Sequence, residues 1–338
     1  MAFREDKSVV FVKQELLNIL WCPSCGSDLG LMKAIINGNE IEEGELNCEG
    51  CGSIYPIIRF IPRFVPSDNY AGNFGFQWNR FLKTQLDSYT GKPIARERFL
   101  KRMDCHLTEL NGRMVLDVGC GAGRYAEIAL SMGAKLVAVD YSSAVDACWQ
   151  NLHSYPNVNV VQADIYRLPF KPASFEFVYC FGVLQHTPDV EGAFKALPVQ
   201  LLSGGKLSVD VYPKLFLNMI WPKYWLRPFT KGMDADRLFP LVLSMVKTLF
   251  PVSIAIGRIP YIGTKLRYAI PVANYEGIFP LTMEQLREWA VLDTFDMLSP
   301  LHDNPQSANT LRRWFEQSGM KNVQIFRPEF IVGRGIKA

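Results

Sequence analysis

Four cysteines near the N-terminus of the 338-residue chain have the spacing of metal ligands. Cys22 and Cys25 form one C-x-x-C pair, and Cys48 and Cys51 form a second pair. Each pair can make a tight turn that presents two thiolates, and four thiolates complete a tetrahedral zinc site. Disulfides or a redox pair are the alternative uses, but a redox C-x-x-C does not need a second copy. We therefore expect one Zn²⁺ held by these four cysteines.

A glycine-rich turn follows a short apolar segment in the middle of the chain. Residues 114–117 predict a buried strand, and residues 125–132 predict an amphipathic helix. Between them Gly119, Gly121 and Gly123 stand at every second position. A strand, a glycine-rich turn and a helix N-terminus form the nucleotide-binding corner of a doubly wound sheet. Glycine is needed there because the backbone must turn tightly and let a ligand approach it closely.

Polar residues follow two further strands that the sequence predicts. Asp140 comes directly after the strand 135–139 and stands 21 residues beyond Gly119, where an acid can bind the two hydroxyls of a ribose. A helix N-cap is the alternative use, but the serines that follow Asp140 suit that position better. The strand 175–180 runs into the segment FGVLQHTPD. Because the carboxyl ends of parallel strands line the ligand crevice, we expect this segment to face a substrate.

Two of the four histidines are candidates for acid–base chemistry. His186, in the segment FGVLQHTPD, is placed by pattern in the crevice, and imidazole suits a general base near neutral pH. The alternative is that His186 only shapes the pocket or binds a cofactor. His302, in a polar turn that returns from a long insertion, is a second candidate.

The segment VLDVGCGAGRY at residues 115–125 resembles motif I of class I S-adenosylmethionine (SAM) methyltransferases. The segment FGVLQHTPD is similar to the V-L-x-H-x-x-D stretch of small-molecule methyltransferases. FGFQWNRF with TQLD beyond it is similar to a segment that precedes motif I in methyltransferases of polysaccharide and natural-product pathways. The resemblance implies SAM as cofactor, with Asp164 at the adenine amino group and Ile165 against the ring. The full set of cofactor residues that we expect is Asp117, Gly119, Cys120, Gly121, Gly123, Asp140, Tyr141, Asp164, Ile165, Cys180, Gln185, Phe76 and Trp78.

The N-terminal segment that contains the four cysteines also resembles a known family. LLNILWCPSCGSDL and GELNCEGCGSIYPIIRFIPRFV look like the small zinc-ribbon proteins that activate tRNA methyltransferases, and like the zinc module of rRNA guanine methyltransferases. Residues 1–66 carry a net charge of −3, which is a poor docking surface for a phosphate backbone. We therefore favour a structural ribbon that packs on the catalytic domain. Since the two sites would lie in separate modules, loss of Cys22 is expected to spare SAM binding.

The whole chain predicts an α/β protein, a doubly wound Rossmann-like sheet of seven strands with an N-terminal zinc ribbon and a helical lid insertion. Residues 213–270, within the insertion, carry a net charge of +7 interleaved with aromatic residues. A solvated basic face is the ordinary explanation, but an anionic small molecule, RNA or a membrane surface would also fit. The predicted division is a ribbon at 1–66, a linker with cap helices at 67–111, the SAM-binding core at 112–212, the insertion at 213–305, and a helix with two strands at 306–338.

Composition indicates the compartment. The first residues, MAFREDKSVV, lack the apolar core of a signal peptide. The most apolar run, 238–256, is interrupted by Pro240, Lys247 and Pro251, so we expect no transmembrane segment. Cysteines with metal spacing and a SAM enzyme suit a reducing compartment, so the protein is expected in the cytoplasm. The sequence favours no oligomeric state.

Three functions are compatible with these patterns. The first is a SAM-dependent O- or N-methyltransferase of a small, anionic molecule, such as a sugar or sugar nucleotide in a polysaccharide or natural-product pathway. The second is an rRNA or tRNA methyltransferase, which the ribbon and the basic insertion favour; the acidic ribbon and the overall net charge of +3 oppose it and make a nucleic-acid partner the weaker expectation. The third is a non-catalytic adaptor that retains the fold, which the intact glycines and acids oppose.

Overall fold

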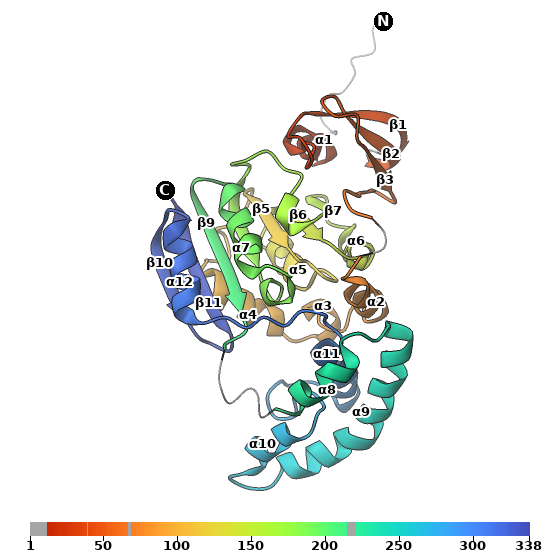
Figure 1. Cartoon of the computed structure of the whole chain (residues 1–338), viewed down its shortest axis with the longest axis vertical. Coiled ribbons are helices and arrows are strands. Elements are labelled where there is room, and N and C mark those ends of the chain that lie inside the picture. Colours follow the sequence, from red (N-terminus) through yellow and green to blue (C-terminus); the bar gives the residue numbers. More distant parts are fainter. Residues whose placement is uncertain (1–11, 39, 67–68, 215–220) are drawn as a thin grey trace, which may run out of the picture.

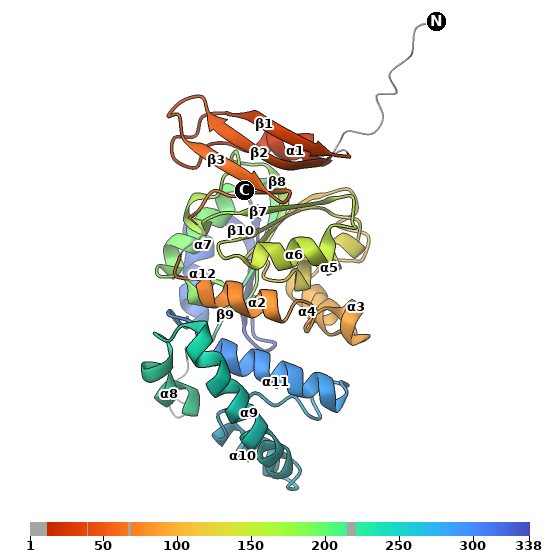
Figure 2. The ribbon, with the colours of Figure 1, turned by 90° about the vertical axis from the view of Figure 1, so that its right-hand side faces the viewer.

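The computed structural model describes residues 12–38, 40–66, 69–214 and 221–338. A small antiparallel sheet, a central seven-stranded sheet and a helical insertion follow one another along the longest axis of the molecule (Figures 1 and 2). The predicted start of the linker, residues 67–68, and residues 215–220 of the predicted insertion lie outside the described residues.

The central sheet has the order β10-β11-β9-β8-β5-β6-β7. Strands β5 to β9 run parallel, whereas β10 and β11 are antiparallel to their neighbours. This confirms the predicted seven-stranded α/β sheet. The strands are β5 (Met114–Val118), β6 (Lys135–Asp140), β7 (Val158–Gln162), β8 (Phe175–Cys180), β9 (Leu201–Val211), β10 (Met320–Phe326) and β11 (Ile331–Lys337).

Both faces of this sheet are covered, as expected for a doubly wound fold. Successive residues of β5 point to opposite faces, so Val115 belongs to one hydrophobic core and Leu116 to the other. Three helices contribute to the core on the Val115 side: α4 (Ile94–Met103), α5 (Arg124–Ser131) and α6 (Ala144–Leu152). Helices α7 (Val190–Val199) and α12 (Ala308–Gln317) contribute to the core on the Leu116 side.

Strand β9 begins earlier than the sequence predicts. The glycines at 204 and 205 suggest the end of a helix before a strand at 206–211, but the strand includes them. Phe175 of β8 pairs with Leu201, and Phe177 pairs with Lys206, so β9 carries extra residues in a bulge. Gly204 adopts a φ of 79° there, a conformation that glycine tolerates and other residues rarely adopt.

The insertion between β9 and α12 has a hydrophobic core of its own. It contains α8 (Pro222–Thr230), α9 (Ala235–Gly257), α10 (Gly263–Leu266), the 3-10 turn η4 (Arg267–Ala269) and α11 (Met283–Leu298). The long helix α9 packs along α11 through residues spaced four apart, among them Val242, Val246 and Phe250. By length and composition α9 could cross a membrane, but a single such helix is weak evidence because core helices meet the same criterion.

Helix α2 (Gly72–Arg80) lies between the central sheet and the insertion, where it packs against α6, α9 and α11 (Figure 2). The short helix α3 (Asp87–Thr90) links it to α4. Two 3-10 turns, η1 (Ile165–Arg167) and η2 (Leu184–His186), follow β7 and β8. The segments expected to surround a ligand therefore meet at the carboxyl ends of the parallel strands.

The N-terminal unit consists of α1 (Val12–Ile19) and the sheet β1 (Leu29–Asn37), β2 (Glu40–Cys48), β3 (Ile54–Ile58) and β4 (Ile61–Pro62). It packs directly on the central sheet, as expected for a structural ribbon. Leu20 and Leu46 share a hydrophobic core with that sheet, and the Phe64 amide donates a hydrogen bond to the Gln162 carbonyl at the end of β7 (2.8 Å). The ribbon and the central sheet are thus one packed body.

Candidate functional site

A cavity of about 490 Å³ lies at the carboxyl ends of the parallel strands, between the central sheet, α2 and the insertion. Its walls combine residues from all three, including Gly119 of the turn, Trp78 of α2 and Tyr224 of α8. This volume suits a small-molecule site, because such pockets span roughly 300–1,000 Å³. The ribbon contributes none of the described residues of its wall.

The glycine-rich turn forms the floor of this cavity. Gly119 has a φ of 83°, and a Cβ added to it would lie 2.2 Å from a methyl carbon of Val183. Gly121 has a φ of 52°, and its Cβ would lie 3.1 Å from the indole of Trp78. Both positions therefore require glycine. The indole of Trp78 packs against the turn at Gly121.

Asp140 connects the end of β6 to the glycine turn. One carboxylate oxygen accepts a hydrogen bond from the Gly121 amide (3.0 Å), and the other accepts from the amide and hydroxyl of Ser142 (2.9 and 2.7 Å). Burial of the carboxyl raises the pKa of Asp140, and these donors oppose that shift. Three donors leave room for about one more on its two oxygens. Asp140 can therefore bind a ribose hydroxyl while it fixes the shape of the turn.

Asp117 lies behind the turn and is almost fully buried. Burial raises the pKa of Asp117 to about 8, while its hydrogen bond with Tyr179 opposes the shift. Its Oδ2 atom has no hydrogen-bond partner among the described residues. Asp117 thus carries a proton at neutral pH in this structure, which avoids an unpaired charge in the core.

His186 projects into the cavity with one ring nitrogen fixed and the other unpartnered. Its Nδ1 atom lies 3.0 Å from the carbonyl oxygen of His302, which can only accept a hydrogen bond. Nδ1 of the neutral ring must therefore carry the proton, so Nε2 has a free lone pair. Within the described chain Nε2 is buried and has no partner. Tyr212 and Phe74 pack against the ring and hold its orientation.

Arginines occupy the cavity wall beside the glycine turn. Arg124 donates from Nη1 to Gln85 (2.8 Å), whereas its Nε and Nη2 atoms are buried and have no partner in the described part of the chain. Burial and the neighbouring Arg98 and Arg102 lower the pKa of Arg124. Arg102 differs because its Nε lies 3.3 Å from a carboxylate oxygen of Asp210. Arg124 is therefore the cation best prepared to receive an anionic group.

The insertion supplies further charged groups to the opposite wall. Lys223 and Arg227 of α8 both approach the buried carboxylate of Asp303, at 3.5 and 3.7 Å. Asp293 of α11 accepts a hydrogen bond from Gln85 (2.9 Å), and burial raises its pKa to about 6. Asp296 also lines this wall, so its cations and carboxylates are interspersed and either could contact a polar group of a ligand.

The four cysteines of the ribbon converge as their spacing predicts. All four sulfur atoms lie within 4.8 Å of one another, with Cys22 and Cys51 at 3.7 Å and Cys25 and Cys48 at 3.4 Å. The Gly26 and Gly52 amides bond back to the carbonyls of Cys22 and Cys48, which closes each pair into a knuckle. Tetrahedral bonds of about 2.3 Å to zinc would place sulfur atoms about 3.8 Å apart, so the cluster could hold this metal.

Family models match both parts of the chain. Residues 116–209 match the family described as a methyltransferase domain, and residues 13–59 match the Trm112p-like protein family. The chain carries a class I SAM-dependent methyltransferase domain. Its N-terminal unit is a Trm112-like module that contains the four-cysteine cluster. Both the enzyme hypothesis and the adaptor hypothesis require this methyltransferase fold.

Curated relatives match somewhat more than a third of the chain. The ubiquinone biosynthesis O-methyltransferase of Albidiferax ferrireducens is 30% identical over 136 residues, which cover 38% of this chain and 54% of that protein. The enzyme of the same name from Xanthomonas euvesicatoria is 34% identical over 135 residues, which cover 37% and 55%. The chain thus spans about half the length of these relatives.

Among solved structures, the chain is similar to magnesium protoporphyrin IX methyltransferase from Synechocystis with bound S-adenosylhomocysteine. The TM-score is 0.43 at 14% identity, and the match covers 80% of this chain and 97% of that chain.

The methyltransferase domain and α2 bring many of the predicted cofactor residues into the cavity wall. They occupy the turn, the ends of β6 and β7, and one face of α2, and His186 lies with them. The predicted residues in the wall are Gly119, Cys120, Gly121, Asp140, Tyr141, Ile165, Trp78 and His186.

Other predicted residues lie outside that wall. Phe76 packs against Phe239 and Phe295 in the insertion core, because it stands on the side of α2 opposite Phe74 and Trp78. Gln185 is fully buried, and its two side-chain amide atoms have no partner among the described residues. The remaining predicted residues that are outside the wall are Asp117 and Gly123 behind the turn, Cys180 within β8, Asp164, and His302.

Asp164 and His302 lie outside the cavity wall but influence residues that line it. Asp164 caps η1 by accepting from the Tyr166 amide (3.0 Å), and its charge contributes to raising the pKa of Tyr70, which does line the cavity. The imidazole of His302 packs edge-on against Tyr70, and its carbonyl orients His186. His302 therefore acts on the site through its backbone carbonyl, which orients His186, and not through its imidazole.

Sequence reasoning missed several cavity residues of the methyltransferase domain. Arg124 directly follows the last glycine of the turn, so its position in the motif was a usable signal. Tyr70, Lys223 and Asp303 come from segments outside the motifs, and only folding brings them to the same cavity.

Proposed function

We propose that the protein is a SAM-dependent methyltransferase that acts on a small, anionic molecule through an oxygen or nitrogen atom, with oxygen favoured. The observation that carries this proposal is the buried, unpartnered Nε2 of His186 at the cofactor cavity. A hydroxyl acceptor must lose a proton when it is methylated, and a fixed neutral imidazole can take it. The name ubiquinone biosynthesis O-methyltransferase of the two relatives also supports a small oxygen acceptor.

In this proposal the cofactor lies over the glycine turn, with Asp140 at a ribose hydroxyl and Asp164 near the adenine. The unpartnered nitrogens of Arg124 would bind its carboxylate, because Arg124 follows the turn directly. SAM supplies an electrophilic methyl group when bound. The chain's own residues hold the acceptor in line, exclude water by enclosing it, and accept its proton at Nε2 of His186.

An anionic acceptor is supported by the wall that the insertion contributes. Lys223 and Arg227, which both approach Asp303, are the cations that could bind a phosphate or carboxylate of the acceptor. A sugar nucleotide is one molecule of this chemistry. A cavity recessed between the central sheet, α2 and the insertion favours such a ligand over RNA, which would need an open basic surface.

We further propose that the four cysteines bind one structural Zn²⁺ and that residues 1–66, 112–212 and 213–305 serve as ribbon, cofactor core and acceptor-side insertion. Thiolates without disulfides suit a reducing compartment, so a cytoplasmic location is part of the proposal.

The experiment that tests the function is transfer of labelled methyl from SAM to an extract separated into small molecules, RNA and protein. Label in the small-molecule fraction supports the proposal. Label in RNA, with RNA binding that falls steeply as salt rises, would support the RNA enzyme instead. No transfer to any fraction by protein that binds SAM would favour the adaptor.

A further inference from the structure

The end of the insertion carries an unusual concentration of exposed apolar side chains. We call residues 258–268, which join α9 to η4, the tip. The tip lies at the end of the molecule opposite the ribbon (Figures 1 and 2). Tyr261 is 99% exposed and has a φ of 65°, so the backbone turns there and leaves the ring in solvent. The exposed apolar residues of the tip are Ile259, Tyr261, Ile262, Leu266 and Tyr268.

Helix α9 extends this apolar surface along one side of the insertion. Its inner face, exemplified by Val242 and Phe250, is buried against α11, whereas Leu241, Leu243 and Val252 are exposed on the outside. An apolar outer face explains why α9 meets the composition of a membrane span although only a third of it is buried. Crossing a bilayer would strip the insertion of its core, so α9 is suited to lie along a surface instead.

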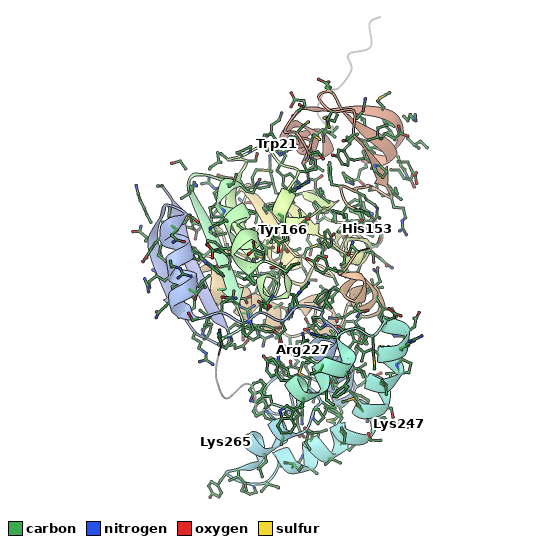
Figure 3. The ribbon with its side chains drawn as sticks, in the orientation of Figure 1. Trp21, His153, Tyr166, Arg227, Lys247 and Lys265 are labelled. Atoms are coloured by element: carbon green, nitrogen blue, oxygen red, sulfur yellow. The ribbon has the colours of Figure 1, made fainter. Side chains whose placement is uncertain are left out.

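Charge on this surface is positive. Lys247 of α9 and Lys265 of the tip project outward (Figure 3), and neither forms an ion pair within the described chain. Arg258 is paired with Glu276. The two acidic residues of 213–270, Asp234 and Asp236, stand at the opposite end of α9, about 30 Å away by helix length.

We propose that the tip and the outer face of α9 dock on an anionic lipid bilayer. Exposed apolar side chains that protrude from a convex end enter the headgroup region, while lysines beside them attract anionic lipids. Tyrosine and tryptophan suit this depth because each has an apolar ring and a polar edge. Trp225 and Phe229 of α8 are also exposed, so the apolar surface continues toward the cavity.

The tip is connected to the cavity by an aromatic pair. Tyr268 of the tip stacks on Trp221 with ring centroids 5.8 Å apart, and Trp221 lines the cavity. Docking would therefore place the part of the cavity wall at Trp221 close to the lipid surface. An acceptor held in that surface, with an apolar part and an anionic head, could reach His186 without crossing water. This second statement rests on the proposed function; the docking does not.

Sedimentation of the full chain with vesicles tests the docking. We expect binding to vesicles of phosphatidylcholine mixed with phosphatidylglycerol, about tenfold weaker binding to phosphatidylcholine alone, and weakening as salt rises. Absence of binding to the anionic vesicles would overturn the proposal. Because the readout is vesicle binding, failure of the proposed methyl transfer would not affect it.

Variants locate the contact. The double variant Tyr261→Asp, Ile262→Asp should lose vesicle binding, and Lys247→Glu with Lys265→Glu should lose the preference for anionic lipid. Tyr261→Trp keeps an interfacial ring and should bind as the unmodified chain does. The matched control Ile35→Asp, Ile36→Asp alters equally exposed residues of β1 in the ribbon and should also retain binding. Retained binding by the Tyr261, Ile262 variant would overturn the proposal, as would a concentration-dependent dimer that the same variant dissociates.

Discussion

At the scale of single residues, the proposed reaction depends on which nitrogen of His186 carries a proton. The carbonyl of His302 fixes the proton on Nδ1, and this leaves Nε2 buried and without a partner among the described residues.

The variant His186→Asn should separate the contributions of the two ring nitrogens. The Asn amide can still donate to the His302 carbonyl but offers nothing at the position of Nε2. We expect kcat to fall by about 10²- to 10⁴-fold with little change in SAM affinity. His186→Gln can place a polar atom near Nε2 but cannot accept a proton there, so it should lose a similar factor in kcat. A normal rate for His186→Asn would mean that alignment alone supports catalysis.

Asp140 offers a second test, directed at the cofactor. Asp140→Asn should weaken SAM binding by roughly ten- to a hundredfold, because a hydrogen bond to a charged group contributes about 1.5–3 kcal/mol. Ser142→Ala is the control, since it removes one of the protein donors to Asp140 without touching the carboxylate. Titration calorimetry with equal affinities for both variants would exclude Asp140 from the cofactor site.

Asp117 predicts a pH dependence of stability in the absence of cofactor. Burial raises the pKa of Asp117 from 3.8 to about 8, so the folded state holds a proton that the unfolded state releases. This contribution to stability is complete below pH 4 and is lost as the pH rises to about 8. Asp117→Asn should therefore raise the free energy of unfolding at about pH 8.5, by at least about 1 kcal/mol, and raise it less near pH 5. Urea unfolding with an equal effect at both pH values would contradict this.

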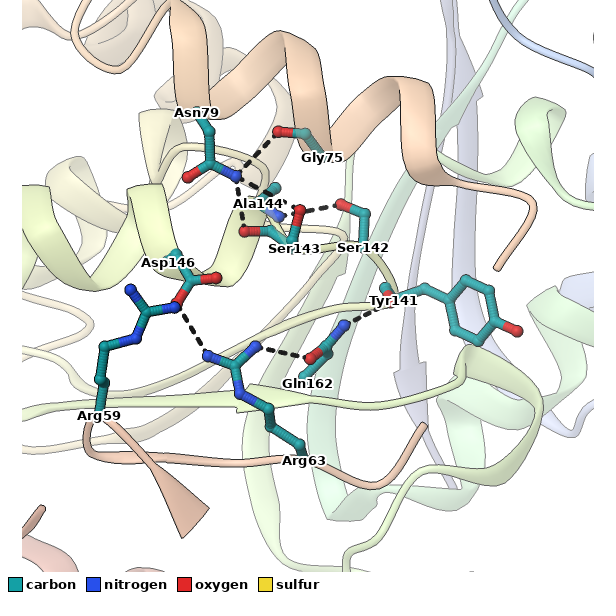
Figure 4. A network of polar contacts seen from close by, with 10 residues as sticks. All are labelled: Arg59, Arg63, Gly75, Asn79, Tyr141, Ser142, Ser143, Ala144, Asp146 and Gln162. Atoms are coloured by element: carbon teal, nitrogen blue, oxygen red, sulfur yellow. Dashed lines mark hydrogen bonds and ion pairs between the residues drawn. The ribbon is translucent and has the colours of Figure 1, made fainter. Parts of the chain in front are cut away.

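At the scale of elements, the ribbon reaches the cofactor site through a short polar network. Arg63 donates to Gln162 and to Asp146, at 2.8 Å each, and Gln162 donates to the carbonyl of Tyr141 (3.1 Å), as Figure 4 shows. Tyr141 directly follows Asp140 and lines the cavity. The segment after β4 therefore supports the loop that carries Asp140, the acid proposed to bind the ribose.

Arg63→Met should weaken SAM binding by about threefold to tenfold, because Gln162 and Asp146 would lose a buried donor. Arg59→Met is a closely matched control, since Arg59 pairs with the same Asp146 but is mostly exposed. Calorimetry should find unchanged affinity for the control. Equal affinities for both variants would show that the network serves packing alone.

Local patterns predicted the elements well where one segment determines them. The glycine turn and Asp140 were predictable because strand, turn and acid are close in sequence. Phe76 and Trp78 look equivalent in the sequence, but helical periodicity sends one toward the insertion core and the other toward the cavity. Lys223 and Asp303 meet only after the insertion folds back, so their contact could not be predicted from spacing.

At the scale of the whole molecule, the ribbon and the central sheet share one core. Sequence analysis treated the zinc site and the SAM site as separate modules, but Leu46 and Ile57 of the ribbon pack in the same core as Val161 of β7. Loss of a metal bound by the four cysteines should therefore also destabilise the central sheet.

Removing zinc with a strong chelator should lower the melting temperature and also weaken SAM binding, because a structural metal contributes much of the folding energy of its module. Restoring Zn²⁺ to the same sample is the control and should recover both. Elemental analysis that finds no metal in anaerobically purified protein would contradict the zinc proposal. A loss of stability with unchanged SAM affinity would instead show that the ribbon and the SAM site are independent.

The position of the ribbon on β7 also bears on self-association. β7 is the last strand of the central sheet, and an uncovered strand at that place offers unpaired amides and carbonyls to any other extended chain. The segment at Arg63 and Phe64 lies against its carboxyl end and uses the Gln162 carbonyl. The ribbon thus shields a sheet edge, and if the proposed zinc holds the ribbon together, solubility of the whole protein is expected to depend on metal supply.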